Sequence, residues 1–346
     1  AVLLSVGWLL LSINTSFLVN VPEQGGEFTE GIVGTPRFVN PILAVTSADR
    51  DIVSLIYSGI MRVGTDGTLT PDLASSVTIS DDGFVYNVVL KDNLTFHDET
   101  RVTAVDVIFT IERIQDPALK SPLRASWEGV ATERISDTEF NIVLPEAYAP
   151  FIENLTVGIL PRHIWEFATA EEFPFSQYNS EPIGSGPYQV AKINRNTSGI
   201  PESYLLTPFK QSDNPKPKIE IVRLNFYPNE EKRIEAFQNG AINAAAGLTR
   251  EAVQAIDESA AVYSEYTTPL PRTFAFFFNQ NEAPVFRDRG VRRALETVVN
   301  REAIINDVFG GFGEAIHTPI PPGFGVRTPT TTATSSLASF DEARDI

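Results

Sequence analysis

The chain has 346 residues, enough for two or three domains, and its 42% hydrophobic and 21% charged residues are typical of a soluble globular protein. Its 27 Lys and Arg stand against 44 Asp and Glu, and the net charge of −17 argues against nucleic acid or an anionic membrane surface as a partner. The lack of cysteine excludes disulfides, thiolate catalysis, cysteine zinc sites and a lipidated cysteine.

The first 22 residues carry no charge, and residues 1–11 are strongly apolar. A membrane-spanning helix needs about 20 mainly apolar residues, whereas the core of a signal peptide needs about 7–15. We interpret residues 1–21 as part of an uncleaved N-terminal membrane anchor. A signal peptide is the first alternative and a buried core helix the second. Either of the first two places the rest of the chain outside the cytoplasmic membrane.

Residues 26–34 predict an extended segment, which leads to the pair Asn40-Pro41. Residues 49–59 predict a helix with Ile52 and Ile56 on its apolar face. Residues 77 to about 161 predict one β-rich unit with helical insertions.

The most regular stretch of that unit is residues 84–117. Its first seven residues alternate like a strand, and turn-prone residues 91–93 end the alternation. Thr103 can cap a helix, with Asp106 in the capping-box position, although the box prefers Glu or Gln there. Pro117 ends the helix. Farther along, Ser136-Asp137 predicts the turn of a hairpin, and Pro150 begins a short helix.

Residues 182–188 contain Gly184-Ser185-Gly186, which predicts a tight loop entering a strand. Such a loop could hold a phosphate, but neither a GxGxxG pattern nor a Walker lysine accompanies it, so we favour a structural loop. Residues 196–213 are interpreted as an irregular polar insertion and residues 219–226 as a strand.

Asn229 predicts the start of a helix over residues 230–239, with Ile234 and Phe237 inward and Gly240 after its end. Residues 274–279 predict a buried apolar strand. Residues 340–346 begin a helical pattern that stops after about one turn, and the single methionine is Met61. We therefore expect the sequence to be cut at both ends.

The chain shows no pattern typical of catalysis or metal binding. Its three histidines, His97, His163 and His317, are far apart in sequence, and neither HExxH nor GxSxG occurs. His97 lies in a polar turn and is expected to be solvated. We predict a protein that is not an enzyme, with no catalytic or metal-binding residues and no cofactor.

Several motifs, in order along the chain, resemble the family 5 extracytoplasmic solute-binding proteins, the peptide- and nickel-binding receptors of ABC importers. The resemblance covers about residues 26–346 and is clearest at residues 90–110, 182–188 and 286–304. Three positions depart from the family pattern. Glu99 replaces a glycine of the turn at residues 98–100, while Asn243 and Asn300 replace acids.

The resemblance implies an α/β fold, a two-lobed clamp of the periplasmic-binding-protein type II, cluster C, with an extra β-rich subdomain and with its C-terminal part missing. Residues 26–50 and 166–269 would form lobe I, residues 51–165 the β-rich subdomain, and residues 270–346 the start of lobe II. In peptide-binding relatives, the aspartate that pairs with the ligand's amino group comes late in the chain, so we expect it beyond Ile346.

The resemblance also implies an extracytoplasmic, monomeric receptor that captures oligopeptides or dipeptides for ABC permease subunits. The alternatives are another solute, such as a nickel chelate, an opine or an oligosaccharide, or a signalling or scaffold module on the same fold. Extended peptides bind through backbone hydrogen bonds to strand-like segments of the protein. The loop at residues 31–35, the pair Arg37-Phe38, Trp127 and the strand at residues 274–279 are candidates for lining the cleft, and an ordinary core residue is the alternative for Trp127. These candidates are Gly31, Ile32, Thr35, Arg37, Phe38, Trp127, Phe277 and Asn279.

Overall fold

The computed structural model describes residues 23–64, 67–209, 217–257, 263–267 and 273–316. The chain divides into two compact units, Ala1–Leu248 and Thr249–Ile346. The predicted anchor and the interrupted pattern at residues 340–346 lie outside the described residues. Within the described residues, no helix is both long enough and apolar enough to cross a membrane.

One sheet of the first unit has five strands in the order β11-β1-β10-β9-β8. β1 is parallel to β10 and β11, while β9 is antiparallel to β10 and β8. The predicted strands at residues 26–34 and 219–226 are confirmed as β1 and β10. The strands are β1 Glu27–Val33, β8 Tyr188–Arg195, β9 Pro201–Pro208, β10 Ile221–Tyr227 and β11 Ala244–Ala245.

The irregular insertion predicted at residues 196–213 is wrong, because β9 lies within it. Asn196 closes the turn before β9 by accepting hydrogen bonds from the backbone of Ser198 at 2.9 Å and of Ile200 at 3.0 Å. Tyr204 and Leu206 are each 0% exposed. Polar residues on both sides of this apolar core, Glu202 and Ser203 before it and Thr207 after it, made the segment look like a loop.

A second sheet has four antiparallel strands in the order β4-β5-β7-β6. The alternation predicted for residues 84–90 is confirmed in β5, where Tyr86, Val88 and Leu90 are buried. The predicted hairpin joins β6 to β7. The strands are β4 Ala74–Ile79, β5 Val85–Leu90, β6 Ala131–Arg134 and β7 Glu139–Val143, and a separate pair consists of β2 Met61–Val63 and β3 Leu69–Pro71.

α3 (Ala104–Gln115) confirms the helix predicted after Thr103. Asp106 accepts hydrogen bonds from the Thr103 backbone at 2.9 Å and from its hydroxyl at 2.8 Å, so aspartate serves in the capping box. Glu99 has a φ of 68°, the left-handed region that favours glycine. The turn before α3 therefore keeps a glycine-like conformation without glycine.

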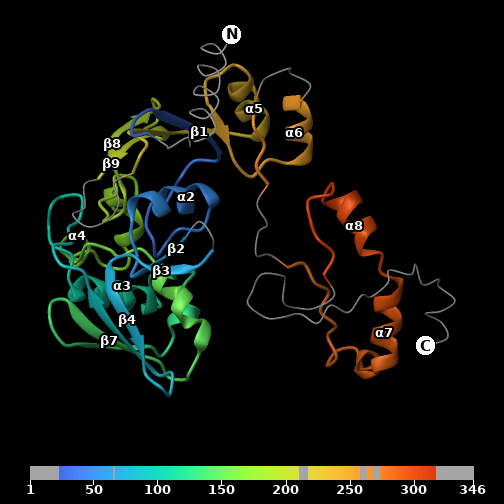
Figure 1. Ribbon diagram of the computed structural model, residues 1–346, viewed down its shortest axis with the longest axis horizontal. Helices are drawn as coiled ribbons and strands as arrows, with labels where there is room; N and C mark the ends of the chain where they lie inside the picture. Colours follow the sequence, from blue (N-terminus) through green and yellow to red (C-terminus); the bar gives the residue numbers. More distant parts are fainter. Residues whose placement is uncertain (1–22, 65–66, 210–216, 258–262, 268–272, 317–346) are drawn as a thin grey trace, which may run out of the picture. The chain divides into compact units, whose positions relative to one another are not determined.

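α2 (Ser47–Ile56) confirms the helix predicted at residues 49–59 and lies between the two sheets of the first unit (Figure 1). α4 (Arg162–Trp165) packs against α3, and α5 (Glu230–Gln238) packs against β1. Four 3₁₀ segments complete this unit: Arg124–Trp127, Ala149–Thr156, Phe173–Phe175 and Gln177–Asn179.

α5 begins after Asn229, as predicted, and Gly240 has a φ of 72°. Its most deeply buried residue is Arg233, which is 5% exposed, whereas the predicted inward residues Ile234 and Phe237 are half-buried. The prediction failed because an arginine was assumed to face water. Its long side chain packs along β1 instead.

The second unit contains α6 (Arg250–Asp257), the 3₁₀ segment Pro284–Arg287, α7 (Arg289–Val298) and α8 (Arg301–Val308). The buried strand predicted at residues 274–279 is wrong. These residues are not assigned to a strand, and Phe274 and Phe277 are 68% and 93% exposed. An apolar run needs a neighbouring strand to pair with, and no strand among the described residues pairs with this one.

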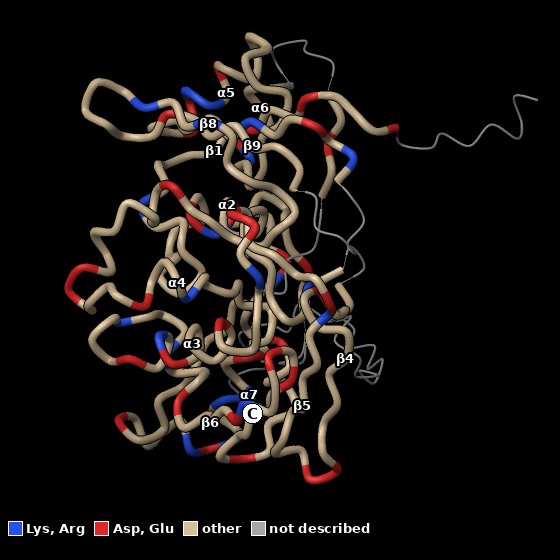
Figure 2. The backbone as a smooth tube through the Cα atoms, turned by 90° about the vertical axis from the view of Figure 1, so that its left-hand side faces the viewer, with Lys and Arg blue, Asp and Glu red and all other residues tan. Residues whose placement is uncertain are grey.

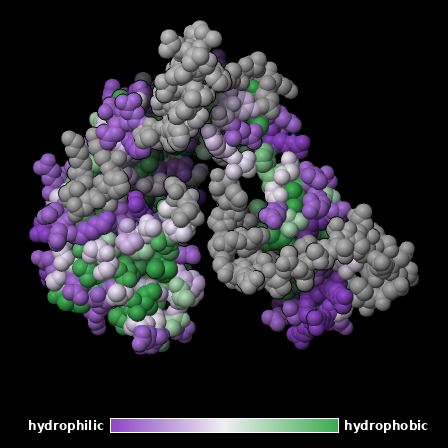
Figure 3. Space-filling model, in the orientation of Figure 1, coloured by the Kyte–Doolittle hydropathy of each residue, from purple (hydrophilic) through white to green (hydrophobic). Residues whose placement is uncertain are grey.

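Acidic and basic residues are spread along the chain, with red segments in many loops (Figure 2). In the view of Figure 3, hydrophobic side chains gather on the part of the first unit that holds α3, β4 and β7. Apolar atoms make up a large part of the surface of any folded protein, so this gathering alone does not identify a binding site.

Candidate ligand-binding site

The candidate site lies where the parallel strands β1 and β10 end. Val33 is paired with Tyr227, and the Gly34 N–H donates to the Tyr227 carbonyl at 2.8 Å. Gly34 then turns the chain out of the sheet with a φ of 91°. Ligands of open α/β sheets bind outside the carboxyl ends of the strands, so the segment after β1 is the candidate ligand-binding segment. We call residues 34–46 the edge loop.

Two of the predicted ligand contacts, Gly31 and Ile32, lie in β1 beneath the edge loop. Ile32 is 5% exposed and belongs to the hydrophobic core. A Cβ on Gly31 would collide with the Ile242 side chain and lie 3.0 Å from Cγ of Arg233. Glycine at this position therefore allows close packing against β1.

Three other predicted contacts lie together on the edge loop. Thr35 and Arg37 are exposed, and Phe38 is half-buried. The Arg37 guanidinium lies over the Phe38 ring, 5.0 Å from its centroid. Such cation–π contacts are worth about 0.5–1 kcal/mol at exposed sites. The edge loop thus presents an aromatic ring and a cation side by side.

Asp49 of α2 holds the edge loop, and it is 1% exposed. Its Oδ1 accepts the backbone N–H groups of Arg37 at 2.7 Å and Phe38 at 2.9 Å. Its Oδ2 accepts those of Thr46 at 3.1 Å and Val45 at 3.4 Å. Hydrogen bonds to a charged acceptor are about twice as strong as neutral ones, so this carboxylate connects both ends of the loop firmly.

The predicted Asn40-Pro41 pair contributes a second support inside the edge loop. Asn40 is 0% exposed, and its Nδ2 donates to Oδ1 of Asn179 at 3.1 Å. Its Oδ1 accepts the Ile42 N–H at 3.1 Å, and the Val39 N–H donates to the Asn179 carbonyl at 2.8 Å. The loop is therefore fixed to a segment about 140 residues later in the chain.

Charged groups also surround β1 itself. Arg233 pairs with Glu230 at 3.0 Å and donates to the Ala246 carbonyl at 2.8 Å. Burial raises the pKa of Glu30, the charge of Asp51 raises it further, and Arg233 opposes both. The Glu30 carboxyl therefore resists ionisation more than an exposed glutamate does.

The remaining predicted contacts do not belong to β1 or the edge loop. Trp127 is 1% exposed and packs edge-on against Phe151 at 5.1 Å, inside the core of the first unit. Phe277 and Asn279 belong to the second unit. Phe277 is exposed, and Asn279 accepts the Asn281 N–H at 3.1 Å. Within the first unit, the structure brings together the candidates on β1 and the edge loop.

Sequence reasoning missed Asp49, although a signal for it was present. Thr46 and Asp49 have the Ser/Thr-x-x-acid spacing of a capping box, the pattern recognised at Thr103. The additional bonds from Asp49 to residues 37 and 38 connect a helix to a preceding loop. No local pattern reports that contact.

The expectation that His97 is solvated is wrong. Its Nε2 lies 3.1 Å from the Gly186 carbonyl, its Nδ1 accepts the Gly184 N–H at 3.3 Å, and its ring meets Phe209 edge-on at 4.7 Å. Burial lowers the pKa of His97 to about 4, against the opposing effect of the Gly186 hydrogen bond. His97 therefore binds the turn before α3 to the glycine loop at residues 184–186.

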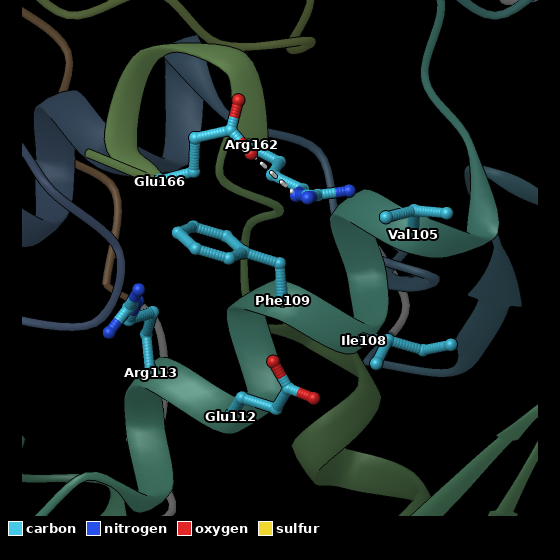
Figure 4. Close-up of a pocket in the computed structure, with 7 residues that line it drawn as sticks. All are labelled: Val105, Ile108, Phe109, Glu112, Arg113, Arg162 and Glu166. Atoms are coloured by element: carbon cyan, nitrogen blue, oxygen red, sulfur yellow. Dashed lines mark ion pairs between the residues drawn. The ribbon is translucent and has the colours of Figure 1, made fainter.

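A separate pocket of about 400 Å³ opens between α3 and α4. The Phe109 ring lies between Arg113 on one side and the Arg162–Glu166 ion pair, at 2.9 Å, on the other (Figure 4). The pocket is lined by two arginines and two glutamates around apolar side chains. Because α3 and α4 form it, it is separate from the edge loop. The pocket is lined by Val105, Ile108, Phe109, Glu112, Arg113, Arg162 and Glu166.

In the part of the chain that the structure describes, no three His, Asp or Glu side chains lie close enough together to hold a metal ion. The chemistry that the edge loop offers is hydrogen bonding, aromatic contact and one exposed cation. These are means of binding a solute.

Residues 68–346 match the family described as bacterial extracellular solute-binding proteins, family 5 Middle. The oligopeptide-binding protein AppA of Bacillus subtilis strain 168 is 26% identical over 310 residues, covering 87% of this chain and 55% of AppA. A nickel-binding periplasmic protein of Escherichia coli strain K12 is 25% identical over 279 residues, covering 78% of this chain and 51% of that protein.

Solved structures give the same result. The substrate-binding protein CtaP of Listeria monocytogenes is 31% identical with a TM-score of 0.69, covering 83% of this chain and 57% of CtaP. Bacillus subtilis AppA, solved with a nonapeptide, is 25% identical with a TM-score of 0.69, covering 87% of this chain and 59% of AppA. The chain spans about half the length of the curated relatives it matches.

Proposed function

Because the chain belongs to family 5 of the bacterial extracellular solute-binding proteins, we propose that the protein is the substrate-binding component of an ABC importer. It captures extended peptides between two lobes and delivers them to permease subunits. The two-lobed α/β fold is that of the family's solved members. The match to receptors whose names and structures include oligopeptides supports the choice of ligand.

The observation that carries the proposal is the edge loop. Thr35, Arg37 and Phe38 lie at the carboxyl ends of parallel strands on a loop fixed by the buried Asp49. A preorganised loop loses little conformational entropy when a ligand binds. An extended peptide offers carbonyl oxygens to the Arg37 guanidinium and apolar side chains to the Phe38 ring, so the loop fits this class of solute.

In this proposal Gly31 and Ile32 support the site by packing, whereas Trp127 packs in the core against Phe151. Phe277 and Asn279 remain predicted ligand contacts from lobe II. We also propose the division into lobe I (residues 26–50 and 166–269), a β-rich subdomain (residues 51–165) and the start of lobe II (residues 270–346). The pairing of β1 with β10 supports joining the two segments of lobe I.

The protein acts outside the cytoplasmic membrane as a monomer, held there by an N-terminal anchor, and it performs no enzymatic reaction. The family is one of extracellular binding proteins, which supports the location. The apolar run at residues 1–11 supports the anchor.

The test is isothermal titration calorimetry of the full-length protein with di-, tetra- and nonapeptides of alternating alanine and serine. Backbone-directed recognition predicts saturable binding of at least one length with little dependence on side chains. A nickel–histidine chelate, an opine and a maltooligosaccharide serve as competing classes. Binding of one of these without any peptide binding would contradict the proposal.

A further inference from the structure

Asp49 does two things with one carboxylate. As the third residue of α2 it completes a capping box with Thr46, whose hydroxyl accepts the Asp49 N–H at 3.1 Å. Its Oδ2 accepts the Thr46 N–H. Its Oδ1 accepts the N–H groups of Arg37 and Phe38, which precede the helix by about ten residues. The helix start and the edge loop therefore share one acceptor.

This carboxylate is 1% exposed, and no ion pair joins it to an arginine, lysine or histidine among the described residues. A buried carboxylate without a cation needs hydrogen-bond donors, since burial of an uncompensated charge is costly. Here all of those donors are backbone N–H groups of the edge loop and of the helix start. The Asp49 carboxylate therefore depends on the edge loop for its hydrogen-bond donors, and the edge loop depends on the carboxylate for its conformation.

We propose that Asp49 is a positioning residue of the ligand site, which fixes the edge loop so that Arg37 and Phe38 are presented to the solute. The inference rests on the proposed function. Asp49 does not face the solute itself. Because Arg37 and Phe38 are both bonded at their own backbone N–H groups, the positions of their Cα atoms are set before ligand arrives.

The chain provides a matched control in Asp106. It occupies the same position of the capping box at the start of α3, is 6% exposed, and also reaches a second segment, accepting the Arg162 N–H at 3.0 Å. Its bonds support α3 and α4 and do not include the edge loop. Replacing Asp106 therefore removes a buried capping carboxylate, as replacing Asp49 does, but it should not change ligand binding.

The experiment compares Asp49→Asn with Asp106→Asn in the full-length protein. An amide has one acceptor oxygen in place of two and carries no charge. It therefore cannot accept both sets of backbone N–H groups, and any bond that it keeps to Arg37 and Phe38 is weaker than the bond to a carboxylate. We expect the amides of Arg37 and Phe38 to exchange hydrogen about tenfold faster in Asp49→Asn, measured without ligand, and to be unchanged in Asp106→Asn.

The second readout is the affinity for the tightest of the alanine–serine peptides. We expect about tenfold weaker binding by Asp49→Asn and a change below about threefold in Asp106→Asn, at similar losses of Tm. Equal affinity losses in both variants, or unchanged exchange at residues 37 and 38, would overturn the inference. If the unmutated protein binds no peptide, the proposed function fails, while the exchange measurement still decides the role of Asp49.

Should Asp49→Asn fail to fold, Asp49→Glu takes its place, because it keeps the charge and both acceptors on a longer side chain. Faster exchange at Arg37 and Phe38 and weaker peptide binding, with a native Tm, support the inference. Weaker peptide binding with native exchange at both amides, or native binding with faster exchange, would overturn it.

Discussion

Removal of the Phe109 side chain tests how α3 is held. Phe109 is 5% exposed, and its ring carries the Arg113 guanidinium 4.9 Å from the centroid. Replacing a buried phenylalanine with alanine costs about 3–5 kcal/mol, the larger values belonging to cavities that stay empty. Phe109 lines an open pocket, so water and the flexible arginines can enter the space. We therefore expect Phe109→Ala to cost about 3 kcal/mol.

The assay is urea unfolding followed by far-UV circular dichroism, with the free energy taken from the transition of the unit that contains both sheets. Phe167→Ala is the control, because Phe167 is 82% exposed and its loss should change stability by less than about 0.5 kcal/mol. A loss below about 1 kcal/mol for Phe109→Ala, or an equal loss for the two variants, would refute the placement of Phe109 in the core.

Two further predictions concern the contact between His97 and the glycine loop. Gly184→Ala should lower stability by about 2 kcal/mol or more in the same assay, because its Cβ would collide with the Ile56 carbonyl oxygen and lie 2.8 Å from the carbonyl carbon; an unchanged unfolding midpoint would contradict this packing. The pKa of His97 is lowered from 6.5 to about 4, so its contribution is fully present above about pH 6.5 and is lost as pH falls toward 4. This contribution is at most about 3 kcal/mol. Stability measured from pH 7 to 4 should fall less steeply in His97→Gln, and parallel profiles would show that His97 does not titrate with folding.

Local patterns predicted the parts of the fold whose contacts are close in sequence. The alternation of β5, the Thr103 cap of α3, the hairpin of β6 and β7 and the end of α5 at Gly240 all follow from turn chemistry and burial period. In these elements the residues that decide the structure lie within a few positions of one another.

The failures share a physical cause, which is dependence on distant partners. β9 is a strand because β8 and β10 pair with it, and His97 is half-buried because Gly184, Gly186 and Phe209 contact it. Residues 274–279 have the composition of a buried strand, but no described strand pairs with them. Whether the turn at His97 or the apolar run at residues 274–279 is buried depends on which other segments pack against it, and the sequence alone does not give those contacts.

The candidate site shows the same division. Arg37 and Phe38 could be predicted as ligand contacts from the resemblance to the family, whereas the role of Asp49 depends on bonds between a helix and a loop. Trp127 was also a candidate ligand contact, yet it is packed against Phe151 in the core. The type of a residue and its position in the sequence identify candidate ligand contacts. Only the three-dimensional contacts distinguish a residue that faces the ligand from one that holds it in place.

The central claim is that this protein captures peptides. Its most direct test is mass spectrometry of the small molecules released when the full-length protein, purified under native conditions, is denatured. We predict a mixture of peptides of related length and varied sequence, released in amounts comparable to the protein, because backbone recognition ignores side chains. Release of a sugar, an opine or a nickel chelate in place of peptides would contradict the account.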